Sequence, residues 1–284
     1  NPYLLIDIAR GVDFKQIDKM ALDLGVSYDN DKRIASGIKY GLIRSTYNGH
    51  ACVEKNNLIE FVINLLDVNS ENVEDGLINL KVKEEIVIET REKGEYIYLY
   101  NFYQTEREIA YRIKKLQESK NIKKILNLNT QLKKVEQISS IELSEKQREA
   151  LKLVNENNVS IITGGPGTGK TTIIKNIIEI YEEQGKKVIL AAPTGRAAKR
   201  MTETTNKEAS TLHRLLEIGK FDEESFYKNT SDYEGAPIDA DIIIVDEMSM
   251  VDMFLMNYLL KCIYQGTKLV LVGDVDQLAS VGPG

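Results

Sequence analysis

Hydrophobic residues recur with helix spacing through much of the first hundred positions. Over 31–47 and again over 57–66 they lie three or four residues apart, which predicts two amphipathic helices. Residues 85–100 alternate as two strands around Glu92-Lys93-Gly94-Glu95, the pattern of a β-hairpin. Helices followed by a hairpin indicate a winged-helix-like module. Its tyrosines Tyr96, Tyr98 and Tyr100 share one strand face, where we expect core packing rather than base stacking.

From residue 159 onwards, short apolar runs alternate with helical segments. Four such runs occur, each followed by a polar loop: 159–163, 187–192, 241–245 and 268–272. Strands that alternate with helices predict an α/β fold with a parallel, doubly wound sheet. Ligands bind such sheets at the carboxyl ends of the strands, so we expect the four loops to meet at one edge.

The composition is that of an ordinary globular protein. The 284 residues allow two domains, and 42% are hydrophobic and 28% charged. No apolar run approaches the roughly 18 residues of a membrane span, and no signal peptide is evident. Cys52 and Cys262 lie far apart without ligand-like neighbours, which favours reduced thiols over a disulfide or a zinc site. We expect a cytoplasmic monomer with no membrane partner.

Charge is unevenly distributed along the chain. The net charge is −6, yet residues 107–134 carry nine basic residues against Glu108 and Glu118. This run is either a nucleic-acid contact or a solvated connecting helix.

A glycine-rich segment follows the first of the four apolar runs and precedes a helical one. Gly164, four further residues and then Gly169-Lys170-Thr171 form a complete Walker A phosphate loop. Glycines let the backbone wrap a polyphosphate so that its N–H groups point at the oxygens. We expect a nucleotide here, with Lys170 at the β- and γ-phosphates and the Thr171 hydroxyl on Mg²⁺. The binding residues are Gly164, Gly165, Pro166, Gly167, Thr168, Gly169, Lys170, Thr171 and Thr172.

An acidic pair, Asp246 and Glu247, ends the third apolar run. A buried parallel strand would deliver both carboxylates at its carboxyl end. Asp246 would then hold Mg²⁺, partly through water, and Glu247 would orient and deprotonate the attacking water. Taken alone, the pair could equally be a helix N-cap.

Further segments resemble the motifs of RecD-like superfamily-1 DNA helicases, the family of the exodeoxyribonuclease V alpha chain. The resemblance covers 143–284 and is weak before it. The matching segments are Leu143–Gln147 (Q-motif), Ala192–Ala198 (motif Ia), Ser210–Leu216, Val245–Asp252 (motif II) and Leu271–Gly284 (motif III). Met248 and Ala279 stand where the family often has alanine and proline.

The resemblance implies a RecA-like P-loop domain in which the motif III strand separates the Walker B strand from the Walker A strand. It also implies that Gln147 reads adenine and that Gln277 senses the γ-phosphate as part of the catalytic set. Single-stranded DNA would contact Pro193, Thr194, Gly195, Arg196 and His213. On the residues alone, Arg196 could belong to a solvated helix face, and His213 could simply pack on a helix.

The implied function is that of an ATP-dependent DNA helicase, moving 5′ to 3′ in DNA repair and recombination. Single-stranded DNA and other repair proteins would be its partners. The arginines that complete such sites lie on a second RecA-like domain, here beyond Gly284, so we expect a fragment that hydrolyses ATP very slowly by itself. Two alternatives stay open: a P-loop ATPase that remodels RNA or protein, and a non-catalytic DNA-binding module.

These expectations divide the chain into four parts. They are a helix-hairpin-helix-like segment (1–27), a helical, winged-helix-like domain (28–104), a basic helical connector (105–140) and a RecA-like ATPase domain (141–284). In the first part, Gly11 marks the turn and Asp13 stands where a second glycine is usual. The turn either binds a DNA phosphate or is purely structural.

Overall fold

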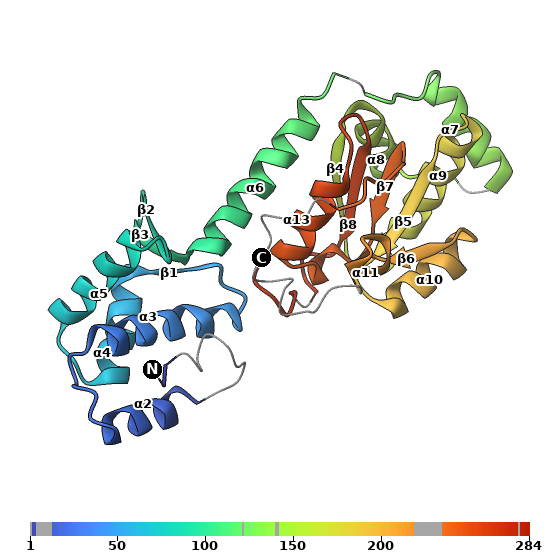
Figure 1. The fold of residues 1–284 in the computed structure, drawn as a ribbon. Coiled ribbons are helices and arrows are strands. Elements are labelled where there is room, and N and C mark those ends of the chain that lie inside the picture. The colour runs from blue at the N-terminus through green and yellow to red at the C-terminus, as the bar shows by residue number, and fades with distance from the viewer. Residues whose placement is uncertain (1, 4–12, 121, 140–141, 219–234, 278) are drawn as a thin grey trace. The chain divides into compact units, whose positions relative to one another are not determined.

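A computed structural model describes the whole chain except residues 1, 4–12, 121, 140–141, 219–234 and 278 (Figure 1). The chain forms two compact units, residues 1–106 with 281–284, and residues 107–280. The boundaries expected at residues 27, 104 and 140 stay predictions. No helix in the described part is long and apolar enough to cross a membrane.

Helices pack on a small sheet in the first unit. The helices are α2 (Phe14–Asp23), α3 (Asp31–Thr46), α4 (Lys55–Leu66) and α5 (Ser70–Val82). The strands β1 (Cys52–Glu54), β2 (Ile86–Arg91) and β3 (Gly94–Leu99) are antiparallel in the order β1-β3-β2. The predicted helices and hairpin are therefore present. Residue pattern alone did not reveal β1 or α5. The turn near Gly11 lies outside the described residues.

The hairpin corrects one expectation about the tyrosines. Arg91 pairs with Gly94, so Glu92 and Lys93 form a two-residue turn. Tyr98 is only 1% exposed, which confirms core packing at this position. Tyr100 does not share its strand face, because the strand ends at Leu99 and Tyr100 begins helix α6 (Tyr100–Gln117).

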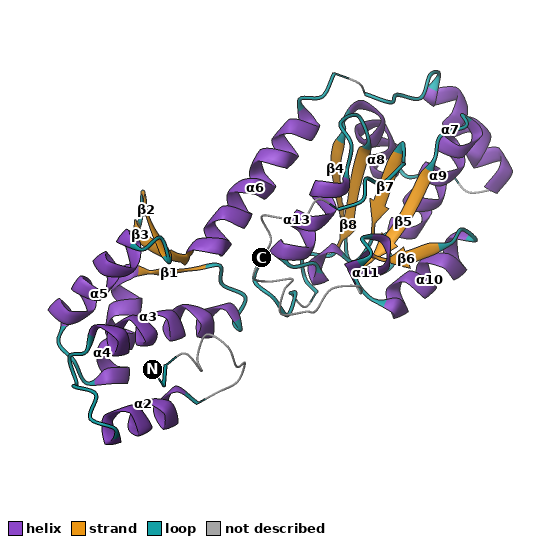
Figure 2. Ribbon diagram, in the orientation of Figure 1, coloured by secondary structure: helices purple, strands orange, loops and turns teal. Residues whose placement is uncertain are grey.

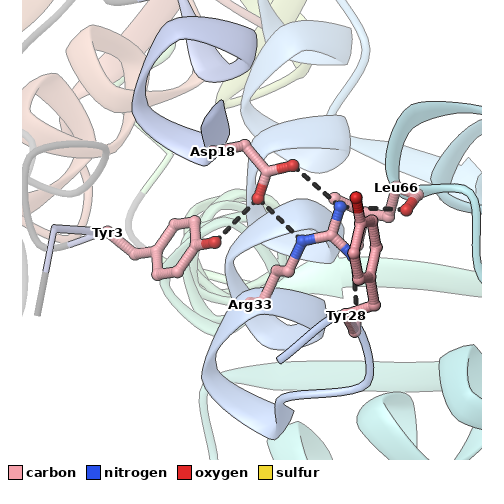
Figure 3. A network of polar contacts seen from close by, with 5 residues as sticks. All are labelled: Tyr3, Asp18, Tyr28, Arg33 and Leu66. Carbon is pink, nitrogen blue, oxygen red and sulfur yellow. Dashed lines mark hydrogen bonds and ion pairs between the residues drawn. The ribbon is translucent and has the colours of Figure 1, made fainter. Parts of the chain in front are cut away.

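A buried ion pair holds the helices of the first unit together (Figure 3). Arg33 of α3 donates from Nε and a terminal nitrogen to the two oxygens of Asp18 in α2, both at 2.8 Å. The same guanidinium donates to the carbonyls of Tyr28 at 2.7 Å and Leu66 at 2.9 Å, and the Tyr3 hydroxyl donates to Asp18 at 2.7 Å. Arg33 is 2% exposed, so these hydrogen bonds take the place of nearly all those that water would make to the guanidinium.

The second unit is a parallel α/β domain (Figure 2). Its strands are β4 (Val159–Thr163), β5 (Val188–Ala192), β6 (Ala209–Thr211), β7 (Ile242–Val245) and β8 (Lys268–Gly273). All neighbours are parallel, in the order β4-β8-β7-β5-β6. The predicted RecA-like arrangement is confirmed, since β8 of motif III lies between the Walker A strand β4 and the Walker B strand β7.

Helices bury the sheet of the second unit and begin or end at its functional loops. They are α7 (Leu128–Ser139), α8 (Glu145–Glu156), α9 (Lys170–Glu183), α10 (Gly195–Thr205), α11 (Leu212–Leu215) and α13 (Met253–Cys262), with a 3₁₀ turn η2 (Met248–Met250). One core joins α7, α8 and α9 to alternate residues of β7 and β8. Strand β7 is fully buried, which explains its unbroken apolar sequence.

A buried lysine closes the end of α8. Lys268, the first residue of β8, has 0% exposure. Its Nζ donates to the carbonyls of Val154 (2.8 Å) and Asn155 (3.0 Å) in the last turn of that helix and of its C-cap residue Asn157 (2.7 Å). Burial, together with the charge of Lys124, lowers the pKa of Lys268 to about 8. The three donors of the ammonium thus satisfy carbonyls that a helix end leaves free.

The basic run of 107–134 lies mostly on α6 and α7. Lys123 pairs with Asp241 at 2.5 Å, and Lys134 pairs with Glu183 of α9. Acids outside the run therefore offset part of its charge. Whether it contacts nucleic acid or only connects stays a prediction.

Candidate nucleotide and DNA site

The phosphate loop joins β4 to α9 with the backbone geometry that its glycines permit. Gly167 has φ 76° and Gly169 has φ 90°, a left-handed region that favours glycine. Gly169 is the N-cap of α9, so Lys170, Thr171 and Thr172 form the first turn of that helix. The partial positive charge of a helix N-terminus therefore lies at the end of the loop.

The lysine of this loop folds back over it. Lys170 Nζ donates to the Gly164 carbonyl and, at 3.1 Å, to the Gly165 carbonyl. The Thr168 hydroxyl donates to the same Gly165 carbonyl at 2.8 Å. A Cβ at Gly164 would lie 2.6 Å from the Thr168 hydroxyl oxygen, so this position has no room for a side chain. Pro166 and Thr168 are exposed between them.

Gln147 lies against this loop although it belongs to another helix. A Cβ at Gly169 would be 2.2 Å from Gln147 Nε2. The other end of the amide completes a capping box at the start of α8, because Gln147 Oε1 accepts from the Ser144 N–H at 3.0 Å. The predicted adenine-reading residue and the predicted phosphate loop are thus neighbours, and Ser144 caps α8, a position that serine often takes.

The acidic pair follows β7 directly. The Asp246 N–H donates to the Ala191 carbonyl at 3.0 Å, and Asp246 Oδ1 accepts from the Glu247 N–H at 2.9 Å. Burial raises the pKa of Asp246, while the positive charges of Lys170 and Arg200 partly oppose that rise. The positive charge of the phosphate-loop lysine therefore favours the ionised form of the Asp246 carboxylate.

Glu247 has an unusual backbone for its residue type. Its φ of 56° and ψ of 43° place it in the left-handed region. That conformation costs energy at a non-glycine residue, and residues that adopt it are concentrated at functional sites. Glu247 occupies the N-cap position of η2, but its side chain makes no capping hydrogen bond. The carboxylate is therefore not used as the helix cap that the sequence left open.

The motif III loop is organised by an aspartate that the sequence reasoning missed. Asp274 is 4% exposed; its Oδ1 accepts from the Asp276 N–H at 3.1 Å and its Oδ2 from Gln277 Nε2 at 3.4 Å. The Gln277 N–H also donates to the Asp274 carbonyl at 3.3 Å. An aspartate that follows a buried strand and precedes a turn was the available signal.

The predicted DNA residues lie at the carboxyl ends of β5 and β6. Thr194 caps α10 by accepting from the Ala197 N–H at 3.3 Å, which leaves Gly195 and Arg196 exposed at the helix start. Pro193 precedes them and is half-buried. His213 is exposed on α11. Burial raises the pKa of Asp252, the N-cap of α13, and hydrogen bonds from the Leu255 and Phe254 backbone partly oppose that rise. Because the sheet is parallel, these loops share one edge with the Walker loops.

Comparisons with known proteins agree with this arrangement. Residues 147–283 match the family model described as an AAA domain, and residues 1–52 match that of the ATP-dependent RecD2 DNA helicase HHH domain. Over 96% of its length the chain is 32% identical to the ATP-dependent RecD2 DNA helicase of Deinococcus radiodurans. Along nearly its whole length the chain is therefore similar to RecD-like helicases, and the matched domain supports nucleotide binding at its P-loop.

The similar proteins are longer than the chain. The RecBCD enzyme subunit RecD of Buchnera aphidicola is 34% identical over 66% of the chain. The chain spans 38% of the Deinococcus protein and 33% of the Buchnera protein. Among solved structures, the Pif1 helicase from Candida albicans is 28% identical, with a TM-score of 0.36, over 49% of this chain and 34% of that one.

Proposed function

We propose that the protein to which these residues belong is an ATP-dependent DNA helicase that couples hydrolysis to movement along single-stranded DNA. The observation that carries this proposal is the meeting of separate motifs at one sheet edge. The phosphate loop touches Gln147, its Lys170 acts electrostatically on Asp246, and the Thr194 loop leaves the same edge. The names of the similar RecD2 and RecD proteins support the same activity.

Mg²⁺ is the metal that the donors fit. The Thr171 hydroxyl and the Asp246 carboxylate are hard oxygen ligands, which Mg²⁺ prefers. Within the described residues no group of three His, Cys, Asp or Glu side chains is arranged to hold a metal. That agrees with a metal held by one or two side chains, substrate phosphates and water. When bound, it would neutralise charge on the β- and γ-phosphates.

The chain's own residues would do the remaining work. Lys170 and the N-terminus of α9 would bind the β- and γ-phosphates, and Gln147 would contact adenine. Glu247 would orient and deprotonate the attacking water, a role worth about 10²–10⁴ in rate. Gln277 would detect the γ-phosphate. Arginines from a second RecA-like domain would complete the charge stabilisation, which is worth about 10³–10⁵.

DNA would be held by groups that suit its phosphates. Exposed backbone N–H groups at the start of α10 and the Arg196 guanidinium can capture phosphate oxygens. His213 would contact the same strand from α11. Movement from 5′ to 3′, a role in repair and recombination, repair-protein partners, a cytoplasmic location and action as a monomer belong to the same proposal.

ATP turnover by the full-length protein tests this function. We expect single-stranded DNA to stimulate hydrolysis more than RNA does, and Lys170→Ala to abolish it. Lys175→Ala is the matched control, since Lys175 is exposed on the same helix α9. Equal stimulation by RNA, or none by DNA, would contradict the proposal.

A further inference from the structure

Strand β8 ends where three functional segments meet. The carbonyl of Gly273 accepts from the Gly164 N–H of the phosphate loop at 3.3 Å. On its other side, a Cβ at Gly273 would lie 3.4 Å from Met248 Cβ and 3.6 Å from the Ser249 nitrogen in the turn that follows Glu247. Gly273 therefore bonds to the phosphate loop through its carbonyl, and a side chain at this position would contact the turn that follows Glu247.

The next residue, Asp274, continues this junction into the motif III loop. Its carboxylate is buried, and burying a charge is costly unless hydrogen bonds compensate. The compensating donors come from the loop itself: the Asp276 N–H at 3.1 Å and Gln277 Nε2 at 3.4 Å. The side chain of Gln277 is thus hydrogen-bonded to the residue that directly follows Gly273.

The two bonds differ in a way that matters for a sensor. The bond to the Asp276 N–H has ordinary length and defines the turn. The bond to the Gln277 amide orients that amide. At 3.4 Å it is long, so breaking it costs little free energy. Gln277 is exposed, whereas Asp274 is not.

We propose that Asp274 is the positioning residue of this site: it holds the Gln277 amide toward the junction of the Walker loops and releases it when a γ-phosphate is present. This rests on the proposed role of Gln277 in ATP hydrolysis. Asp274 contacts neither nucleotide nor water in this scheme and acts only through Gln277.

Steady-state ATPase kinetics of the full-length protein with single-stranded DNA provide the test. Asp274→Asn keeps one oxygen for the Asp276 N–H and replaces the acceptor of the Gln277 amide. We expect kcat to fall about five- to ten-fold, with KM for ATP and the nucleotide Kd within about two-fold of wild type. Asp276→Asn removes the same charge from an exposed side chain two residues away and should leave kcat unchanged.

A double variant separates positioning from a structural role. If Asp274 acts only through Gln277, then Asp274→Asn added to Gln277→Ala should lower kcat no further than Gln277→Ala alone. Multiplied losses would overturn the positioning role without contradicting the proposed DNA-stimulated ATPase. An unchanged kcat in Asp274→Asn or in Gln277→Ala would also overturn the positioning role. Absence of DNA stimulation in the wild-type protein would overturn the proposed function and this inference with it.

A second substitution covers the case in which Asp274→Asn does not fold. The hydroxyl of Asp274→Ser can accept from the Asp276 N–H in an equivalent turn but cannot reach the Gln277 amide. It should show the same loss of kcat, and the same lack of further loss when combined with Gln277→Ala. An unchanged kcat here would overturn the proposal.

Discussion

Replacing Lys268 by methionine should loosen the far end of the helix that carries Gln147. The change removes the three bonds from Nζ to the last carbonyls of α8. Each carbonyl left unsatisfied costs about 1–2 kcal/mol. Against this, the pKa of Lys268 falls to about 8, so burying its charged form costs the folded state about 3 kcal/mol. Methionine carries no charge and avoids that cost. The net loss should be about 2 kcal/mol.

Hydrogen exchange measured over residues 150–158 checks this value locally. A loss of about 2 kcal/mol should speed exchange of these amides about thirty-fold at neutral pH. Lys152→Met is the control, because Lys152 is exposed on the same helix. If Lys268→Met exchanged at the wild-type rate, the ammonium would not be the group that closes α8.

Three further changes test other parts of the structure. Arg33→Met should lower the free energy of unfolding of the first unit by about 3–5 kcal/mol in urea, because it leaves the Asp18 carboxylate buried without its partner. Adding Asp18→Leu should recover much of that loss. A loss below about 1 kcal/mol in Arg33→Met would show that the ion pair does not stabilise this unit. Gly169→Ala should lower the free energy of unfolding by at least about 1–2 kcal/mol in thermal unfolding, because the φ of Gly169 is 90° and a Cβ there would meet the amide of Gln147. Gly165→Ala is the control and should cost far less, because no atom lies within 4 Å of a Cβ at that position. Equal losses in the two variants would refute this reasoning. The folded pKa of Lys268 lies below its unfolded value, so the unfolded chain binds more protons between about pH 8 and 10.5. The stability of wild type relative to Lys268→Met should therefore be constant below about pH 8 and rise from there to about pH 10.5, and a flat difference across that window would contradict the lowered pKa.

Local chemistry was the predictable part of the site. The Walker A loop and the acidic pair are defined by short spacings, and apolar runs of five or six residues predicted four of the five strands of the sheet. The strand order came from the family resemblance, because nothing local tells β8 to insert between β4 and β7.

The missed features depend on partners far away in the sequence. Strands β1 and β6 have only three residues each, too few for a hydrophobic pattern. Lys268 looks like a polar strand boundary until the end of α8 supplies its acceptors. Arg33 likewise appears as a surface charge on a helix, and only the fold brings Asp18 to it. Buried charges of this kind escape pattern analysis, since their burial depends entirely on distant groups.

The strand order also has a consequence for the protein's synthesis. Val159 of the Walker A strand pairs with Leu269, so β4 has no neighbour in this sheet until the ribosome has made β8. Strands β5, β6 and β7 can associate earlier, whereas the phosphate loop waits for a partner more than a hundred residues downstream. Contacts so distant in sequence form slowly. A nascent chain stalled before Lys268 should therefore expose Ile162 of β4, which is buried in the folded unit, to chaperones and bind no nucleotide.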